Sequence, residues 1–107
     1  MTQKTRREKL EEFVATHPGD AFARYGLALE CVNAGEHELA VGHFRKLIET
    51  NPSYVAGYFH FGQLLARLKR TEEARAILSS GVSVAQKAGN QHALEEMRAA
   101  LAEIQPA

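Results

Sequence analysis

The sequence has a single cysteine and no excess of charge of either sign. Cys31 is the only cysteine, so an internal disulfide cannot form and a reduced compartment is the default expectation. Basic and acidic side chains balance at 13 each, which gives a formal net charge of zero. Dedicated nucleic-acid binders, and proteins held to anionic membranes by charge, normally carry a basic excess. We therefore expect neither a nucleic-acid partner nor a membrane partner.

Long hydrophobic runs are missing as well. No segment approaches the roughly 20 apolar residues that a membrane-spanning helix needs. The basic start of the chain is followed by Glu11 and Glu12, where a signal peptide needs its apolar stretch. The 107 residues, of which 45% are hydrophobic and 24% charged, are typical of one ordinary globular domain. The sequence thus predicts a soluble, cytoplasmic protein.

What the chain does contain is an internal period of 34 residues. Pro18 and Pro52 are 34 positions apart, and each stands between two stretches of helical pattern. The same spacing separates Ala40 from Ala74, Phe44 from Leu78, Leu27 from Phe61, and Ala28 from Gly62. A period of this length with two helices per period is typical of a helical solenoid.

The apolar residues recur at helical spacing along the whole chain. This pattern predicts an all-α protein with six helices, near residues 3–16, 20–34, 36–50, 53–68, 71–88 and 90–105. Asp20, Ser53, Thr71 and Asn90 are the residues expected to cap helix starts, and Gly35 and Gly89 the ones expected to end helices. The fifth helix should run to Ala88, about one turn beyond its counterpart in the preceding period.

The repeated residues form a recognisable motif. One period carries Leu27-Ala28, Gly35, Ala40-x-x-x-Phe44 and Pro52, and the next carries Tyr58-x-x-Phe61-Gly62 and Glu73-Ala74-x-x-x-Leu78. This motif resembles that of the tetratricopeptide repeat family. The chain departs from the family pattern at Arg24, where a large aromatic residue is usual, at Cys31 and Leu65, where Tyr is usual, and at Gln86, where a Pro is usual.

The resemblance implies one domain, 1–107, built as an antiparallel helix-pair solenoid with a right-handed superhelix. Its two repeat units would be residues 21–54 and 55–88. Residues 3–18 would form an N-terminal helix that corresponds to the second helix of an earlier unit. Residues 90–105 would form a C-terminal capping helix, slightly out of phase with the repeat.

No residue constellation predicts catalysis, a metal or a cofactor. The five histidines include no pair at the helical spacing of metal ligands. Cys31 falls on the packed side of its helix, where we expect a buried, unreactive thiol, and His37 and His43 are expected on an exposed side. Arg67, Lys69 and Arg70 end a helix, where the macrodipole favours cations, although contact with nucleic acid is the alternative. We expect a protein that is not an enzyme.

The resemblance also implies a binding surface, because first helices line a concave, ligand-binding face in this family. Carried onto this chain, the face comprises Phe22, Tyr25, Leu29, Asn33, Phe59, His60, Gln63 and Arg67. Alternatively, a terminal helix covers part of it, and Phe22 and Tyr25 then belong to the core. The clamp with which some members hold chaperone carboxylates is not expected, because its positions carry no cationic pair.

The resulting functional hypothesis is a protein-interaction module that binds another protein or a peptide on this face, without cofactor. The alternative is a structural protein that self-associates through its first helix. In either case we expect a monomer or a weak homodimer.

Overall fold

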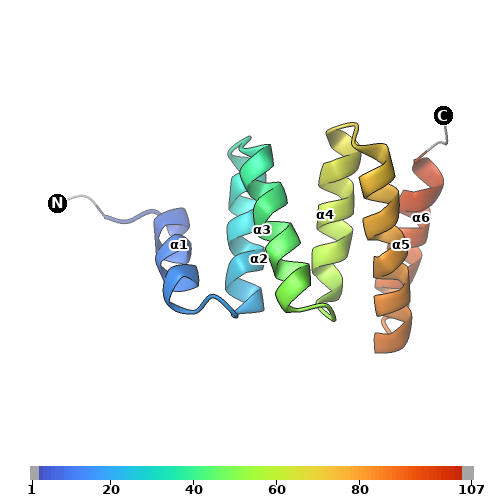
Figure 1. The fold of residues 1–107 in the computed structure, drawn as a ribbon, viewed down its shortest axis with the longest axis horizontal. Helices are drawn as coiled ribbons and strands as arrows, with labels where there is room; N and C mark the ends of the chain where they lie inside the picture. The colour runs from blue at the N-terminus through green and yellow to red at the C-terminus, as the bar shows by residue number, and fades with distance from the viewer. Residues whose placement is uncertain (1–2, 105–107) are drawn as a thin grey trace. The chain divides into compact units, whose positions relative to one another are not determined.

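The computed structural model describes residues 3–104. In this range the chain forms six α-helices and no β-strand, as the sequence predicts (Figure 1). The helices are α1 (Arg6–Thr16), α2 (Ala21–Asn33), α3 (His37–Thr50), α4 (Val55–Arg67), α5 (Thr71–Ala88) and α6 (Gln91–Glu103). The predicted extension of α5 to Ala88 is confirmed, since α5 has 18 residues against 14 in α3. None of the helices in the described range has both the length and the apolar character needed to cross a membrane.

The chain divides into two compact units at Pro52. Unit 1, residues 1–51, contains α1, α2 and α3, and unit 2, residues 52–107, contains α4, α5 and α6. Each unit therefore holds one full helix pair and one additional helix. In unit 1 the additional helix precedes the pair, and in unit 2 it follows the pair (Figure 1).

Side-chain capping marks the start of three helices. The Asp20 carboxylate accepts a hydrogen bond from the Ala23 backbone N–H at 2.8 Å, and Asn90 caps α6 in the same manner. At α1, Thr5 and Glu8 form a reciprocal capping box. The predicted caps at Ser53 and Thr71 are wrong. The cap positions of α4 and α5 are Tyr54 and Arg70, and neither side chain caps the helix, so these two helices are held by packing instead.

The helix ends repeat the 34-residue period in their backbone conformation. Gly35 after α2 and Lys69 after α4 both adopt the left-handed conformation, with φ of 77° and 64°. The residue after each one closes the helix end with a backbone hydrogen bond that spans five residues. Glu36 N–H donates to the Cys31 carbonyl and Arg70 N–H donates to the Leu65 carbonyl, both at 2.9 Å. The repeat read from residue types is thus also a repeat of backbone geometry.

The core of unit 1 lies between α2 and α3. The fully buried side chains include Cys31, Phe44 and Leu47, and Ala40 is fully buried among them. Cys31 is buried, as predicted, and burial raises the pKa of its thiol, which disfavours the nucleophilic thiolate. Helix α1 adds a single buried residue, Val14.

The core of unit 2 depends on two glycines at which helices approach closely. A Cβ atom at Gly62 of α4 would overlap the Leu78 side chain of α5. A Cβ atom at Gly81 of α5 would overlap the Met97 sulfur of α6 and lie 2.7 Å from the Tyr58 Cβ of α4. All three helices of the unit therefore meet at Gly81, with no space for a side chain there.

Candidate functional site

A groove runs along the seam between α4 and α6 of unit 2, two helices that pack against each other. It consists of two successive hollows of about 340 and 430 Å³. The first hollow is lined mainly by Phe59, His60, His92 and Glu96, and the second by Gln63, Arg67, Ala100, Glu103 and Ile104. We call these two hollows the α4–α6 groove. Apolar surface predominates in the first hollow and polar surface in the second. Peptide-binding surfaces usually combine the two.

All four site residues predicted on the second repeat line this groove. Phe59 and His60 are half-buried in the first hollow, and Gln63 and Arg67 are exposed in the second. They come together because α4 presents successive turns to α6, so residues three or four positions apart share one face. Their role in binding stays a prediction.

The first hollow contains a histidine, His60, whose pKa is shifted by its surroundings. Burial lowers the pKa of His60, and the Glu96 carboxylate of α6 partly opposes this effect. The ring of Phe59 meets that of His60 edge to face, with centroids 5.4 Å apart. Glu96 also lies 3.4 Å from the exposed His92 side chain. The lowered pKa of His60 favours its uncharged imidazole at neutral pH, beside the ring of Phe59.

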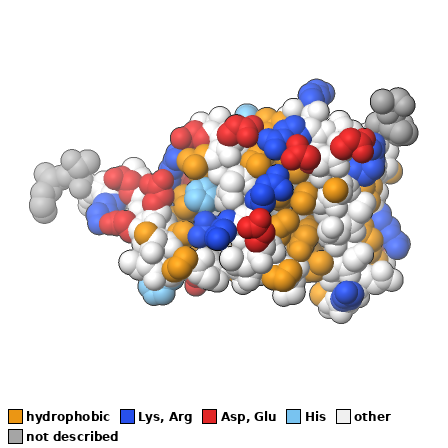
Figure 2. Space-filling model, in the orientation of Figure 1, with side chains coloured by type: hydrophobic (Ala, Val, Ile, Leu, Met, Phe, Trp, Pro, Cys, Tyr) orange, Lys and Arg blue, Asp and Glu red, His pale blue; other side chains and the backbone are white. Residues whose placement is uncertain are grey.

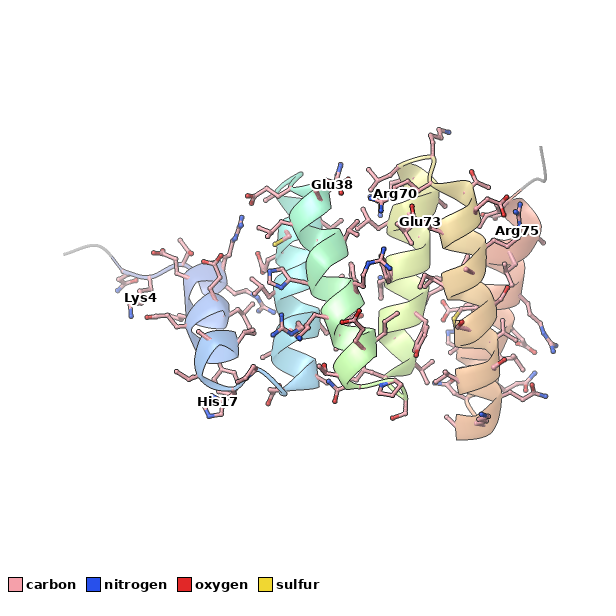
Figure 3. The ribbon with its side chains drawn as sticks, viewed as in Figure 1. Lys4, His17, Glu38, Arg70, Glu73 and Arg75 are labelled. Carbon is pink, nitrogen blue, oxygen red and sulfur yellow. The ribbon has the colours of Figure 1, made fainter. Side chains whose placement is uncertain are left out.

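The second hollow is cationic at its rim. Arg67 stands in the last turn of α4, where the helix dipole favours a positive charge, and it makes no ion pair with residues of the described range 3–104. Lys69 adds a second cation, and Glu103 of α6 a carboxylate. An exposed arginine and the amide of Gln63 together can bind a carboxylate and a peptide bond. By contrast, Arg70 is turned to Glu73 at the start of α5, with their side chains 2.7 Å apart (Figure 3).

The four site residues predicted on the first repeat lie on α2 in unit 1. Phe22 is 75% exposed, so the alternative in which a terminal helix covers it and places it in the core is wrong for this residue. Asn33 is exposed, whereas Tyr25 and Leu29 are half-buried. Their spacing places them along one face of α2. Their contribution to a binding surface stays a prediction, as it does for the residues of unit 2.

Two histidines of unit 1 are less exposed than the sequence predicts, because His37 and His43 are both half-buried. Both were predicted on an exposed side of α3, and Arg24 of α2 lies 3.3 Å from the Nδ1 of His43. Burial, followed by the nearby Arg24 charge, lowers the pKa of His43. Arg24 also donates to the backbone oxygen of Pro18 at 3.3 Å. The presence of Arg24 where the family usually has an aromatic residue was the available signal for this contact.

Charges on the molecular surface are mixed. Figure 2 shows acidic and basic side chains interspersed on the face that it draws. Residues 3–104 contain no group of three or more His, Cys, Asp or Glu side chains that could hold a metal ion. The α4–α6 groove brings together the site residues predicted on the second repeat, and it is therefore the candidate binding site.

Comparisons with known proteins agree with this structure. The tetratricopeptide repeat family pattern matches residues 32–104. A TPR repeat-containing protein of Pseudomonas aeruginosa is 30% identical over 90 residues, which cover 84% of this chain and 86% of that protein. A tetratricopeptide repeat domain protein of Salinibacter ruber, solved by NMR, is 38% identical, with a TM-score of 0.77 over 81% of this chain and 88% of its own.

A further solved structure extends the likeness over more of the chain. A protein of Bordetella parapertussis has a TM-score of 0.80 over 95% of this chain and 89% of its own. Its identity is 22%, so it supports the fold alone. These likenesses confirm the helical repeat solenoid that the 34-residue period predicts. The chain belongs to the tetratricopeptide repeat family.

Proposed function

We propose that this protein binds an extended or helical segment of another protein in the α4–α6 groove, without chemical conversion of that segment. The family and fold are those of protein–protein interaction modules in general. The observation that carries the proposal is that Phe59, Gln63 and Arg67 line one open groove within a single compact unit.

The groove offers different contacts at its two ends. Phe59 supplies an aromatic anchor in the first hollow, and aromatic side chains contribute much of the affinity at many interfaces. Arg67, with Lys69, favours an acidic group at the other end. A ligand with an apolar side chain followed by a carboxylate therefore fits the groove. In unit 1, Phe22 and Asn33 are exposed on α2, and we propose them as contacts that unit 1 makes by itself.

The test is affinity capture from the native host, followed by measurement with the captured partner. Phe59→Ala and Arg67→Ala should each weaken binding by at least about fivefold, or ~1 kcal/mol. Two matched controls lie in the same unit and outside the groove. Ile77→Ala removes a half-buried apolar side chain from α5, and Arg98→Ala removes an exposed cation from α6.

Circular dichroism first establishes that all four variants remain folded. The proposal fails if the two groove variants bind as tightly as the parent protein. It also fails if the controls lose as much affinity as the groove variants, because the loss would then come from the unit as a whole.

A further inference from the structure

One face of α1 in unit 1 carries exposed apolar side chains. Arg6, Lys9, Leu10 and Phe13 line a hollow of about 520 Å³, and we call these four residues the α1 stripe. Phe13 is 42% exposed, and its ring stacks on that of His17 with centroids 4.2 Å apart. Figure 3 shows His17 at the end of α1, next to the turn that leads to α2. The stripe therefore ends in a stacked aromatic pair.

The repeat shows what this face corresponds to in the rest of the chain. Helices α1 and α3 end in the same conformation, with φ and ψ of −130° and 67° at His17 and −136° and 70° at Asn51. In this register, Leu10 takes the place of Phe44 in α3 and of Leu78 in α5, and both counterparts are fully buried. Leu78 packs on Gly62 of α4, the helix that precedes α5.

The α1 stripe thus corresponds to the face of α5 that packs against the preceding helix, α4. No helix among residues 3–104 covers the stripe. Leu10 is turned partly toward Gly26 of α2, since a Cβ atom at Gly26 would lie 3.7 Å from its methyl groups, and it is not fully buried by that contact. Geometry therefore favours a helix as the ligand of this face, in the manner of a helix bound in a groove.

The charges of the stripe restrict which helix can bind. Ala40 and Ala74 stand where α1 has Arg6, so the small residue that permits close helix approach is replaced by a long cation. Arg6 lies 2.8 Å from Glu30 of α2 yet remains 75% exposed, and Lys9 makes no ion pair with the described residues 3–104. An incoming helix with carboxylates on its flank therefore complements Lys9 and the exposed part of Arg6.

We propose that the α1 stripe binds an acidic amphipathic helix from another protein. Leu10 and Phe13 receive its apolar side chains, and Arg6 and Lys9 pair with its carboxylates. A second copy of this chain fits less well. Its own α1 would bring the same two cations to the contact. Its α6 already buries its apolar residues Ala93, Leu94 and Met97 within unit 2, so that face is not available for the stripe.

The probe for the test is a synthetic amphipathic peptide of about 15 residues, long enough to form a helix. It carries Leu on one face and Glu on both flanks. A matched peptide carries Lys in place of Glu. Titration of each peptide into the isotope-labelled full chain, followed by NMR, locates binding through amide shifts. We expect the Glu peptide to shift the amides of Lys9, Leu10 and Phe13, and the Lys peptide to leave them unchanged.

Substitutions distinguish specific binding at the α1 stripe from nonspecific binding of the peptide elsewhere on the protein. Phe13→Ser should weaken the Glu peptide about tenfold, and Lys9→Glu about threefold with a smaller dependence on salt. The controls in the same unit are Leu39→Ser, which removes another exposed apolar side chain, and Lys46→Glu, which reverses another exposed charge. Both controls should bind the Glu peptide as the parent does.

Several outcomes overturn the proposal. If the Lys peptide binds as tightly as the Glu peptide, the ligand need not be acidic. If the amides of α1 do not shift, the peptide does not bind at the stripe. An equal loss of affinity in Leu39→Ser removes its specificity. If sedimentation shows a concentration-dependent dimer that Phe13→Ser abolishes, the stripe binds a second copy instead. Because the stripe belongs to unit 1, these results are independent of the proposed groove in unit 2.

Discussion

The two units contain the same kind of helix pair but hold their additional helix differently. In unit 2, α6 buries Ala93, Leu94 and Met97, and Met97 contacts the surface left free by Gly81. In unit 1, α1 buries only Val14. All three large hydrophobic side chains that are exposed in the described range, Phe13, Phe22 and Leu39, lie in unit 1. One repeat pattern thus yields one unit whose additional helix is well packed and one unit with large apolar side chains left exposed.

Helix α1 is attached to the rest of unit 1 partly by ion pairs, whereas α6 is attached to unit 2 by buried apolar side chains. Arg7 pairs with Glu36, which precedes α3, and Arg6 pairs with Glu30 of α2. Lys4, whose side chain lies beside α1 (Figure 3), pairs with Glu12. These pairs are largely exposed, and exposed ion pairs contribute little to stability and weaken in salt. A helix held in this manner separates from its neighbours more readily than one held by a buried core.

The largest expected difference concerns the residues that attach the additional helices. Met97→Ala should destabilise the protein by about 2–5 kcal/mol, because it opens a cavity at a fully buried site. Val14→Ala should cost about 1–2 kcal/mol, because a smaller and less enclosed side chain is lost. Denaturant unfolding of both variants measures the difference. A cost for Val14→Ala equal to that of Met97→Ala would contradict the comparison.

Two glycines offer the same test with the opposite change in volume. Gly81→Ala should destabilise the protein by roughly 1–3 kcal/mol, because the new Cβ overlaps Met97 and Tyr58. Gly26→Ala should stabilise it by about 0.5–1 kcal/mol, since the new Cβ meets Leu10 at an ordinary distance and alanine favours the helix. Thermal melts of the two variants should shift in opposite directions, and shifts of the same sign would show that the units pack alike.

The left-handed residues that end α2 and α4 give a smaller effect. Gly35→Ala should cost about 1 kcal/mol, because a Cβ atom is strained at a φ of 77°. Lys69→Gly should gain up to about 1 kcal/mol, because the strain already present at a φ of 64° is removed. Differential scanning calorimetry on both variants would measure this, and a loss of stability in Lys69→Gly would be contrary to expectation.

The smallest effect is expected from pH. Burial lowers the pKa values of both His43 and His60 in the folded state, so the unfolded chain takes up protons first as pH falls below about 6.5. Stability should therefore decrease as pH falls through this range and be fully present above it. Around His43, Arg24 and Arg7 reinforce the effect of burial and Glu11 opposes it.

In unit 2, Glu96 opposes the effect of burial at His60. His43→Gln should therefore remove more of the acid-induced loss than His60→Gln. Unfolding free energies measured at pH 7.5 and pH 5.5 make the comparison, with His92→Gln as an exposed control. A loss that is unchanged in both variants would assign the acid sensitivity to other groups.

Local signals were sufficient to predict much of this fold. Helical periodicity and the 34-residue spacing predicted six helices, and Asp20 and Asn90 predicted two of their starts, because these features depend on residues close in sequence. Ser53 and Thr71 failed as predicted caps. The cap positions, Tyr54 and Arg70, lie one residue away, because residue type alone does not fix a helix boundary to within one residue.

The candidate site could be predicted only in part. The family pattern placed Phe59, His60, Gln63 and Arg67 on one face of a helix, where the structure has them. It could not show that α6 forms the opposite wall of the groove, because the last helix is out of phase with the repeat. Nor did it show that Arg24 reaches His43, since that contact joins side chains on different helices.

The most direct test of the central claim is site-specific photo-crosslinking in the native host. A photoreactive residue at position 63, exposed in the α4–α6 groove, should capture one partner protein, and Arg67→Ala should reduce that product. The same group at position 79, exposed on α5 outside the groove, should not capture it. Equal capture from position 79, or no product from position 63 alongside a partner that copurifies, would contradict the account.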